Sequence, residues 1–343
     1  MTRATRWLVL CLVLLSATAC TDGAVADDVV TLRLGHGGSP GDVLDQSIEI
    51  LTEHLDEHTE GRVVIENYGA SQLGNERDLI EGVGIGTVDM TLVTNAPLGN
   101  FVPEALFYDL PALYADLDHV HAVAESSITT EVLAGALLER DMRLLTVTDG
   151  GFRHITNRAR EITEPQDLAG IKMRVQESAV IQATYEAIDG VTAVPVPIGD
   201  LYTALEQGVV DAQENPTILT RDFQFNEVQA YMTLTAHSYF PRHLIINEDA
   251  WEQLRESDQQ ALQEGAEIMK EFKNAYYEDE DEQAREELEE RGMTVSESTS
   301  EFDEALQERM QAEVWPQFYE QIGGGNAARG EEIVDEIMAM ESS

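Results

Sequence analysis

The chain has 343 residues, of which 43% are hydrophobic and 25% charged, so it can bury a sizeable core and has the length of two ordinary domains. Its formal net charge is −44, from 21 basic and 65 acidic residues. Such a charge argues against nucleic acid and anionic membrane surfaces as partners. It suits a salty exterior, where ions screen the self-repulsion of the compact state.

The first twenty residues differ from the rest of the chain. Arg3 and Arg6 precede the apolar run WLVLCLVLL (7–15), and a stretch of small residues leads to Cys20. This pattern predicts a secretory signal peptide, too short to span a membrane stably as a helix. Because a cysteine after small residues resembles the lipoprotein cleavage site, we expect Cys20 to carry a lipid anchor. Ordinary secretion, with cleavage near Ala26, is the alternative.

The segment that follows, residues 21–28, is polar and acidic and is predicted to be a flexible linker. Cys11 would be removed with the signal peptide, so at most one cysteine remains and an internal disulfide is excluded. We therefore expect an exported protein, in the periplasm or on the outer face of the cytoplasmic membrane, whose stability comes from its core.

From residue 29 onward, segments with strand and helix periodicity alternate. Such alternation is typical of an α/β fold with mostly parallel strands. Up to Gly150 the pattern predicts strands at 29–37, 62–69, 87–93 and 142–149, and helices around 44–55, from Asn75 onward and over 116–138.

The alternation starts again after Gly151 and continues to about His237. Residues 79–95 and 201–216 echo each other, since each runs from a helix through a glycine to Val-Asp and an extended segment. We expect the glycines, Gly86 and Gly208, to end their helices with positive φ.

Two similar α/β lobes are the plain inference from this repetition. Residues 29–150 with about 238–280 would form the first lobe, and residues 151–237 with about 281–343 the second. Because open α/β sheets bind ligands beyond the carboxyl ends of their strands, two facing lobes would create a cleft between them.

The segment LAGIKMRVQES, residues 168–178, raises the question of a ligand. Ile171, Met173 and Val175 alternate with polar residues, which predicts a strand with one face in a core and Arg174 on the other face. The pattern alone does not decide whether Arg174 points into water or into a cavity that holds an anion.

The last hundred residues are predicted to be mostly helical. Ser257 and Gln260 fit a capping box, and apolar residues then keep helical spacing toward Leu288. We expect a long helix that braces both lobes. The acidic run 278–282 on this helix lacks the central glycine and alternating ligands of a calcium loop, so it is interpreted as a solvated face.

No motif assembles a catalytic or metal site. GGSPG (37–41) matches the serine-hydrolase elbow, but Pro40 cannot supply the backbone N–H that the oxyanion hole needs. GVGIG (82–86) follows a helix and has the wrong spacing for a dinucleotide loop. His54 and His58 lack an evident third zinc ligand. The residues therefore favour a binding protein without cofactor or metal over an enzyme.

Six segments of the chain form a recognisable series: GASQLGNERDLIEGVGIGTVDM (69–90), NFVPEALFYDLPALY (100–114), GGFRHITN (150–157), LAGIKMRVQES (168–178), LYTALEQGVVDAQENP (201–216) and EVQAYMTLTAHSY (227–239). In this order they resemble the solute-binding proteins of TRAP (tripartite ATP-independent periplasmic) transporters, including the dicarboxylate-binding ones. The resemblance covers about residues 30–250 and implies a two-lobed periplasmic-binding-protein fold with an interdomain cleft.

The resemblance implies that Arg174 reaches into the cleft and forms a bidentate salt bridge with the carboxylate of the ligand. A guanidinium fork suits this task because it matches a carboxylate and keeps its charge. The resemblance also implies a second arginine partner, Arg153, an amide from Asn215, and Gln72 and Glu76 on the opposite lobe. Glu76 has an ordinary alternative role beside the helix dipole.

The chain departs from the family pattern at two positions. Ile198 stands where many members carry Phe or Trp over the ligand, and Gln176 stands where proline is common. An aliphatic wall weakens the case for aromatic or quaternary-ammonium ligands. The resemblance implies delivery of a small carboxylate to a membrane permease; a ligand sensor that feeds a signalling receptor is the alternative, and an exported enzyme is a further one.

Overall fold

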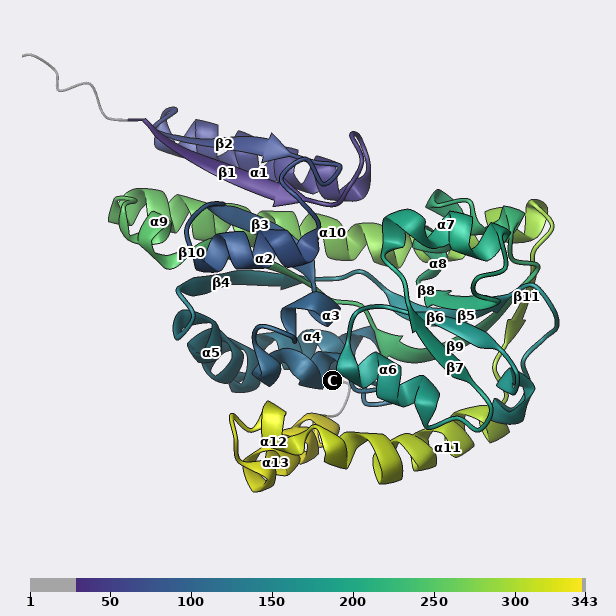
Figure 1. Cartoon of the computed structure of the whole chain (residues 1–343). Helices are drawn as coiled ribbons and strands as arrows, with labels where there is room; N and C mark the ends of the chain where they lie inside the picture. The colour runs from purple at the N-terminus through teal and green to yellow at the C-terminus, as the bar shows by residue number, and fades with distance from the viewer. Residues whose placement is uncertain (1–28, 341–343) are drawn as a thin grey trace, which may run out of the picture.

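The computed structural model describes residues 29–340, and the predicted signal peptide, Cys20 anchor and linker lie outside the described residues. The described chain forms two mixed sheets flanked by helices (Figure 1). The first sheet has the order β2-β1-β3-β10-β4. Its strands are β1 (Val30–His36), β2 (Val63–Tyr68), β3 (Met90–Thr94), β4 (Met142–Thr148) and β10 (Arg242–Asn247).

The second sheet has the order β11-β9-β5-β8-β6-β7. Its strands are β5 (Phe152–Asn157), β6 (Lys172–Val175), β7 (Thr192–Pro195), β8 (Ala212–Asn215), β9 (Tyr231–Tyr239) and β11 (Thr294–Glu297). We call the sheet β2-β1-β3-β10-β4 with its covering helices the first lobe, and the other sheet with its helices the second lobe. The α/β, two-lobed architecture expected from the sequence is confirmed.

The helices cover the faces of both sheets and form most of the C-terminal part. Those before residue 230 are α1 (Val43–Thr59), α2 (Glu76–Gly84), α3 (Asn95–Leu98), α4 (Leu117–Glu125), α5 (Ala134–Leu138), α6 (Ala179–Glu186), α7 (Ile198–Glu206) and α8 (Thr217–Asp222). Those after it are α9 (Glu248–Glu252), α10 (Glu256–Glu290), α11 (Ser300–Arg309), α12 (Tyr319–Ile322) and α13 (Ala327–Met338).

The long helix α10 spans 35 residues and joins the two lobes. It packs against α1 and β4 in the first lobe and against α8 and β11 in the second, and Figure 1 shows it crossing the molecule. Its buried residues include Leu262, Ala266 and Met269, spaced three and four apart as a helix face in a core requires. The expected bracing helix is thus present, and the acidic run 278–282 lies on it.

Strand directions differ in part from the sequence-based expectation. Among the described strands, five pairings are parallel and four antiparallel. The antiparallel pairings all involve β5 or β10. These two strands begin immediately after the chain crosses between the lobes, so each enters its new sheet without a crossover helix to reverse its direction.

Two helix predictions were wrong in detail. The helix expected over 116–138 is interrupted after α4, because Ser126 takes an extended conformation (φ −72°, ψ 166°) and its hydroxyl bonds the carbonyl of Val123. The chain resumes as a π-helical turn and then α5. At the start of α10 no side chain caps the helix, and Ser257 Oγ instead donates to Asp258.

The two glycines of the internal echo behave as predicted. Gly86 and Gly208 follow α2 and α7 with φ of 74° and 70°. This conformation costs glycine little because it lacks a Cβ.

Strand β9 of the second sheet extends to Tyr239, beyond residue 237. The last two helices pack elsewhere: α12 contacts the 3₁₀ segment Pro103–Asp109, and Ile337 in α13 accepts a hydrogen bond from His119. Both contacts reach residues of the range expected in the first lobe. The assignment of helices to lobes stays a proposal.

Gly150 lies where the chain first crosses from one lobe to the other. A Cβ at this position would lie 2.2 Å from the carbonyl oxygen of Phe240, which belongs to the second crossing. We expect Gly150→Ala to lower the free energy of unfolding by about 1–3 kcal/mol, because the backbone of one crossing must shift. Urea denaturation measures the change.

Gly135 provides the matched control for this substitution. It lies in α5, and a Cβ there would meet no atom within 4 Å. We expect Gly135→Ala to raise the free energy of unfolding by about 0.5–1 kcal/mol, as for a solvent-facing helix position. A Gly150→Ala protein as stable as the parent would show that the two crossings are not tightly packed.

Candidate functional site

Arg153 on β5 is the centre of a buried ion pair in the second lobe. Its side chain is 1% exposed and its guanidinium pairs with the carboxylate of Glu214 on β8, which is fully buried. Arg153 Nη2 also donates to Asn215 Oδ1 at 3.0 Å. The antiparallel register pairs His154 with Asn215, so Arg153 lies one position from Asn215 on the neighbouring strand. Two of the predicted ligand residues, Arg153 and Asn215, therefore lie in contact.

Arg174 lies on β6, next to β8 in the same sheet. Met173 and Val175 enter the core as predicted, and Arg174 on the opposite face is also buried, with 2% of its surface exposed. Its Nε donates to the carbonyl of Val196 at 2.8 Å, and its Nη1 has no hydrogen-bond partner within the described residues. Burial lowers the pKa of Arg174 to about 10, partly offset by Glu214.

A third arginine, Arg242, approaches from the first lobe. Its guanidinium lies 5.2 Å from the ring centre of Phe240, and the guanidinium of Arg153 lies 4.6 Å from the same ring. Arg242 Nη1 is 3.4 Å from Glu76 Oε1. Phe240 thus separates two cations that belong to different lobes, an arrangement that a ring favours through cation–π attraction.

Glu76 is at the start of α2, as predicted, and its carboxylate is held in place by β3. It accepts hydrogen bonds from the backbone N–H of Thr94 at 2.9 Å and from the Thr94 hydroxyl at 2.7 Å. Its side chain is 25% exposed. Both oxygens of this carboxylate are therefore committed, and only Oε1 also faces Arg242.

The other two predicted residues, Gln72 and Ile198, are more exposed than the arginines. Gln72 is exposed, and its amide donates to the carbonyl of Gly69 at 3.0 Å, within the same turn. Ile198 begins α7 and is 37% exposed. It follows Val196, whose carbonyl binds Arg174, by two positions.

Sequence reasoning missed Glu214, Phe240 and Arg242. Glu214 was visible within the QENP segment, where a glutamate in a buried strand signals a cationic partner. Arg242 was visible as the only charged side chain in the apolar run from Tyr239 to Ile246. Its partners come from distant parts of the chain, so nothing local indicated its place.

The lobes also touch through a buried aspartate. Asp109 accepts hydrogen bonds from Ser178 Oγ, the N-cap of α6, at 2.7 Å and from Asn95 Nδ2 at 2.8 Å. Burial raises the pKa of Asp109 to about 6. At the neighbouring contact, Asn100 Nδ2 donates to the carbonyl of Glu177 at 2.7 Å. These bonds join the first lobe to the loop directly after β6, the strand that carries Arg174.

Three buried histidines make stability depend on pH. Burial lowers the pKa of His154, His237 and His243 to about 3, against 6.5 in an unfolded chain. Between these values the unfolded chain binds more protons, so each histidine removes about 1.4 kcal/mol of stability per unit that pH falls. Asp109 has a raised pKa and acts in the opposite direction between pH 6 and 3.8.

We therefore expect the free energy of unfolding to fall as pH drops from 6.5 to 5. The three histidines, together with His36 and His54, whose pKa values are also lowered, outweigh Asp109 and His121, whose pKa values are raised. Urea denaturation at several pH values measures the slope. His154→Gln should make that slope smaller by about 1.4 kcal/mol per unit. Equal stability at pH 6.5 and pH 5 would contradict the expectation.

The geometry supports neither a zinc site at His54 and His58 nor a calcium loop at residues 278–282, the two metal sites weighed from the sequence. Within residues 29–340, no group of three or more His, Cys, Asp or Glu side chains could hold a metal ion. The rings of His54 and His58 stack at 4.0 Å, and His58 Nδ1 bonds the carbonyl of His54. In the same part of the chain, no helix is both long and apolar enough to cross a membrane.

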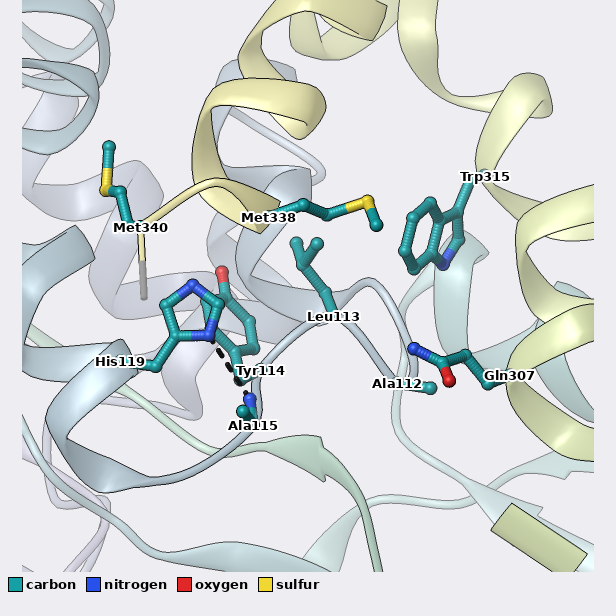
Figure 2. A pocket seen from close by; sticks show the side chains of 9 residues that line it. All are labelled: Ala112, Leu113, Tyr114, Ala115, His119, Gln307, Trp315, Met338 and Met340. Atoms are coloured by element: carbon teal, nitrogen blue, oxygen red, sulfur yellow. Dashed lines mark hydrogen bonds between the residues drawn. The ribbon is translucent and has the colours of Figure 1, made fainter. Parts of the chain in front are cut away.

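A cavity of about 480 Å³ lies away from the arginines, between the C-terminal helices and the first lobe. Figure 2 shows Met338 next to Leu113 with its side chain directed toward Trp315, whereas the Met340 side chain points away from both. Two polar groups at its wall bond to backbone carbonyls: Trp315 Nε1 to Pro111, and Tyr114 OH to Phe107. Among the described residues, the lining contains no arginine or lysine that could pair with a carboxylate, so the buried arginines remain the candidate site.

Known proteins resemble this chain over most of its length. The sequence profile of the bacterial extracellular solute-binding protein family 7 matches residues 34–322. A solute-binding protein of Verminephrobacter eiseniae is 32% identical over 307 residues, which cover 90% of this chain and 88% of that protein.

Solved structures share the fold. A TRAP periplasmic solute-binding protein from Roseobacter denitrificans with bound L-galactonate has a TM-score of 0.80 at 31% identity and covers 91% of this chain and 99% of its own. One from Polaromonas bound to D-erythronate has a TM-score of 0.81 at 29% identity and covers 92% and 100%.

A family match over most of the chain, together with whole-chain structural similarity, identifies a component of a transport system and not an enzyme. The chain belongs to bacterial extracellular solute-binding protein family 7, the periplasmic solute-binding proteins of TRAP transporters.

Proposed function

We propose that this protein binds a small organic carboxylate through Arg174, with Arg153 and Asn215 beside it, and delivers the ligand to a TRAP membrane permease. The observation that carries the proposal is the state of Arg174: a guanidinium 2% exposed whose Nη1 has no partner in the described residues. Leaving a buried charged donor unpaired costs free energy. A carboxylate would supply both the acceptor and the countercharge.

Charge at the site supports the same conclusion. Arg153 is neutralised by Glu214, whereas no carboxylate among residues 29–340 forms an ion pair with Arg174. The second lobe therefore carries one excess buried cation. The relatives with L-galactonate and D-erythronate bound each hold a carboxylate ligand, and a carboxylate would balance this cation.

Closure of the lobes by hinge bending completes the proposal. The crossings at Gly150 and Phe240 are the hinge, and the contacts of Asp109 and Asn100 with the second lobe form when the lobes close. Export to the periplasm, with Cys20 as a lipid anchor to the membrane, is the proposed location. Glu76 serves as a first-lobe wall of the site, and Gln72 and Ile198 line its rim.

A thermal-shift screen of the domain from residue 29 onward, in molar salt, tests the binding. The panel consists of small carboxylates, each with its uncharged amide as control. A ligand at a hundredfold excess over its Kd stabilises the native state by about 2.7 kcal/mol, so we expect at least one acid to raise the melting temperature while its amide does not. A panel of acids without effect on folded protein, shown ligand-free by native mass spectrometry, would overturn the proposal.

Delivery to a permease needs a separate test. Vesicles that contain the membrane subunits are expected to take up the labelled ligand only when the binding protein is added. Binding without uptake would favour the sensor alternative.

A further inference from the structure

Asp109 is a buried carboxylate that bonds to both lobes, with one side-chain donor on each of its oxygens. Asn95 Nδ2, in the first lobe, donates to Oδ1 at 2.8 Å, and Ser178 Oγ, in the second lobe, donates to Oδ2 at 2.7 Å. Burial raises the pKa of Asp109 to about 6, so the group is still ionised at about pH 7.5. Because hydrogen bonds to an ionised acceptor are roughly twice as strong as neutral ones, the bond from Ser178 is a strong link between the lobes.

The first-lobe side of this link is anchored to the sheet. Asn95 Oδ1 pairs with His243 Nε2 on β10 at 3.0 Å, and Asn95 Nδ2 also donates to the carbonyl of Ala105 at 3.0 Å. Asn95 in turn holds Asp109. We therefore expect Asp109 to stay with the first lobe, and not to follow Ser178, when the lobes separate.

The second-lobe side of the link lies in the short loop between β6 and α6. Ser178 is the N-cap of α6 and lies four positions after Arg174. The carbonyl of the neighbouring Glu177 accepts a hydrogen bond from Asn100 Nδ2 at 2.7 Å. We call the bonds Ser178–Asp109 and Asn100–Glu177 the latch. Both bonds hold the same loop, so the latch fixes the end of the strand that carries Arg174 against the first lobe.

Another bond between the lobes lies beside the proposed hinge. The backbone N–H of Ala112 donates to the carbonyl of His237 at 2.7 Å, three positions before Phe240 in the second crossing. When lobes bend about a hinge, groups next to the hinge move little and groups away from it move more. We therefore expect the Ala112 bond to persist in the open protein and the latch, which includes no residue of either crossing, to break.

We propose that the latch sets the rate at which the closed protein releases its ligand, which makes Asp109, Ser178 and Asn100 positioning residues that act without contacting the ligand. The inference rests on the proposed function, since it requires a carboxylate on Arg174 and lobes that close over it. The latch forms after the carboxylate has reached Arg174. Its loss therefore shortens the lifetime of the closed complex and leaves the first encounter unchanged.

Stopped-flow measurement of association and dissociation rates tests the inference, with L-galactonate, D-erythronate and succinate as probes. Ser178→Ala is expected to raise the dissociation rate about tenfold or more and to change the association rate less than about twofold, because it removes a hydrogen bond to an ionised acceptor. Asn100→Ala removes a neutral hydrogen bond and is expected to raise the dissociation rate about two- to tenfold. Ser178→Thr keeps the hydroxyl group and should restore the parental rate.

Two further variants separate the latch from a general loss of stability. Ser178→Ala also removes the cap of α6, and Asn326 is a matched cap, which accepts from the backbone N–H groups of Ala328 and Arg329 at the start of α13. Asn326→Ala should lower stability as the loss of a cap does and leave both rates unchanged. In an Asp109→Asn background, Ser178→Ala should raise the dissociation rate less than it does in the parent, since the ionised acceptor is already lost.

Spin labels measure the closure directly. The chain from residue 29 onward contains no cysteine, so Glu81→Cys on α2 and Glu206→Cys on α7 give one exposed attachment point on each lobe. With a saturating probe, we expect a single short distance between the labels in the parent. Ser178→Ala should add a population with a longer distance.

The possible failures are distinguishable. A parental dissociation rate in Ser178→Ala, an equal change in Asn326→Ala, or a single short distance between the labels in Ser178→Ala would each overturn the inference and leave the carboxylate site intact. A slower association with unchanged dissociation would also overturn it, because the latch would then act before closure. If none of the probes binds the parent, the proposed function fails and the inference fails with it.

Discussion

Arg174→Met is expected to weaken binding of the carboxylate ligand at least about thirtyfold, with little loss of stability in the free protein. Truncating one partner of a buried charge pair costs roughly 2–5 kcal/mol, largely because the other charge is left unpaired. In the free protein the same change removes a buried cation whose Nη1 has no partner among the described residues. The melting temperature without ligand should therefore stay the same or rise.

Titration calorimetry with the best acid from the screen measures the loss, and thermal unfolding measures the stability. Lys172→Met is the control, because Lys172 lies two positions earlier on β6 and is exposed. A variant at position 174 that binds its acid as tightly as the parent would refute the carboxylate assignment, whereas weak binding in a protein that has also lost its fold would not support it.

Glu214→Gln is expected to lower the free energy of unfolding by about 3–5 kcal/mol, the largest stability effect we expect of any single substitution. The pair of Glu214 and Arg153 is almost completely buried, so removing the carboxylate leaves an uncompensated cation. The pKa of Arg174 is already lowered by the charge of Arg153 as well as by burial. Loss of Glu214 would leave both cations without a carboxylate nearby.

Replacing both partners should restore most of this loss. A buried ion pair exchanged for apolar residues of similar volume is often neutral or stabilising, so Arg153→Met combined with Glu214→Leu should be more stable than Glu214→Gln alone. Urea denaturation of the parent, both single variants and the double variant measures the coupling. Glu332→Gln, which breaks an exposed pair with Arg329, should change stability by less than about 1 kcal/mol. A Glu214→Gln protein of parental stability would contradict the expected cost.

Salt screens the acidic surface of the protein much more strongly than it screens the buried cations of the site. The chain carries 65 acidic residues against 21 basic ones, yet Arg153, Arg174, Arg242 and Lys273 are all buried. Surface charges are screened by salt over a few ångströms, whereas charges in a dry interior are screened much less. A few buried cations can therefore hold an anion within a protein that repels anions at its surface.

Local patterns in the sequence determined much of the fold. Alternation at Met173 and Val175 indicated β6, and spacing along 44–55 indicated α1, because burying one face imposes a period on apolar residues. Glycine at positions 86 and 208 marked helix ends, since only a residue without Cβ takes positive φ at little cost. The sequence also indicated that Arg174 leaves the core face of its strand.

Only the tertiary structure decided how these pieces meet. The antiparallel directions of β5 and β10 depend on where the chain crosses between the lobes, which no local period encodes. Arg242 and Glu76 come from distant segments, yet their side chains lie 3.4 Å apart because β10 packs next to α2. Whether an arginine faces water or a dry interior depends on the side chains that pack over it. The pattern of strand β6 therefore could not predict that Arg174 is buried or that its Nη1 has no partner among the described residues.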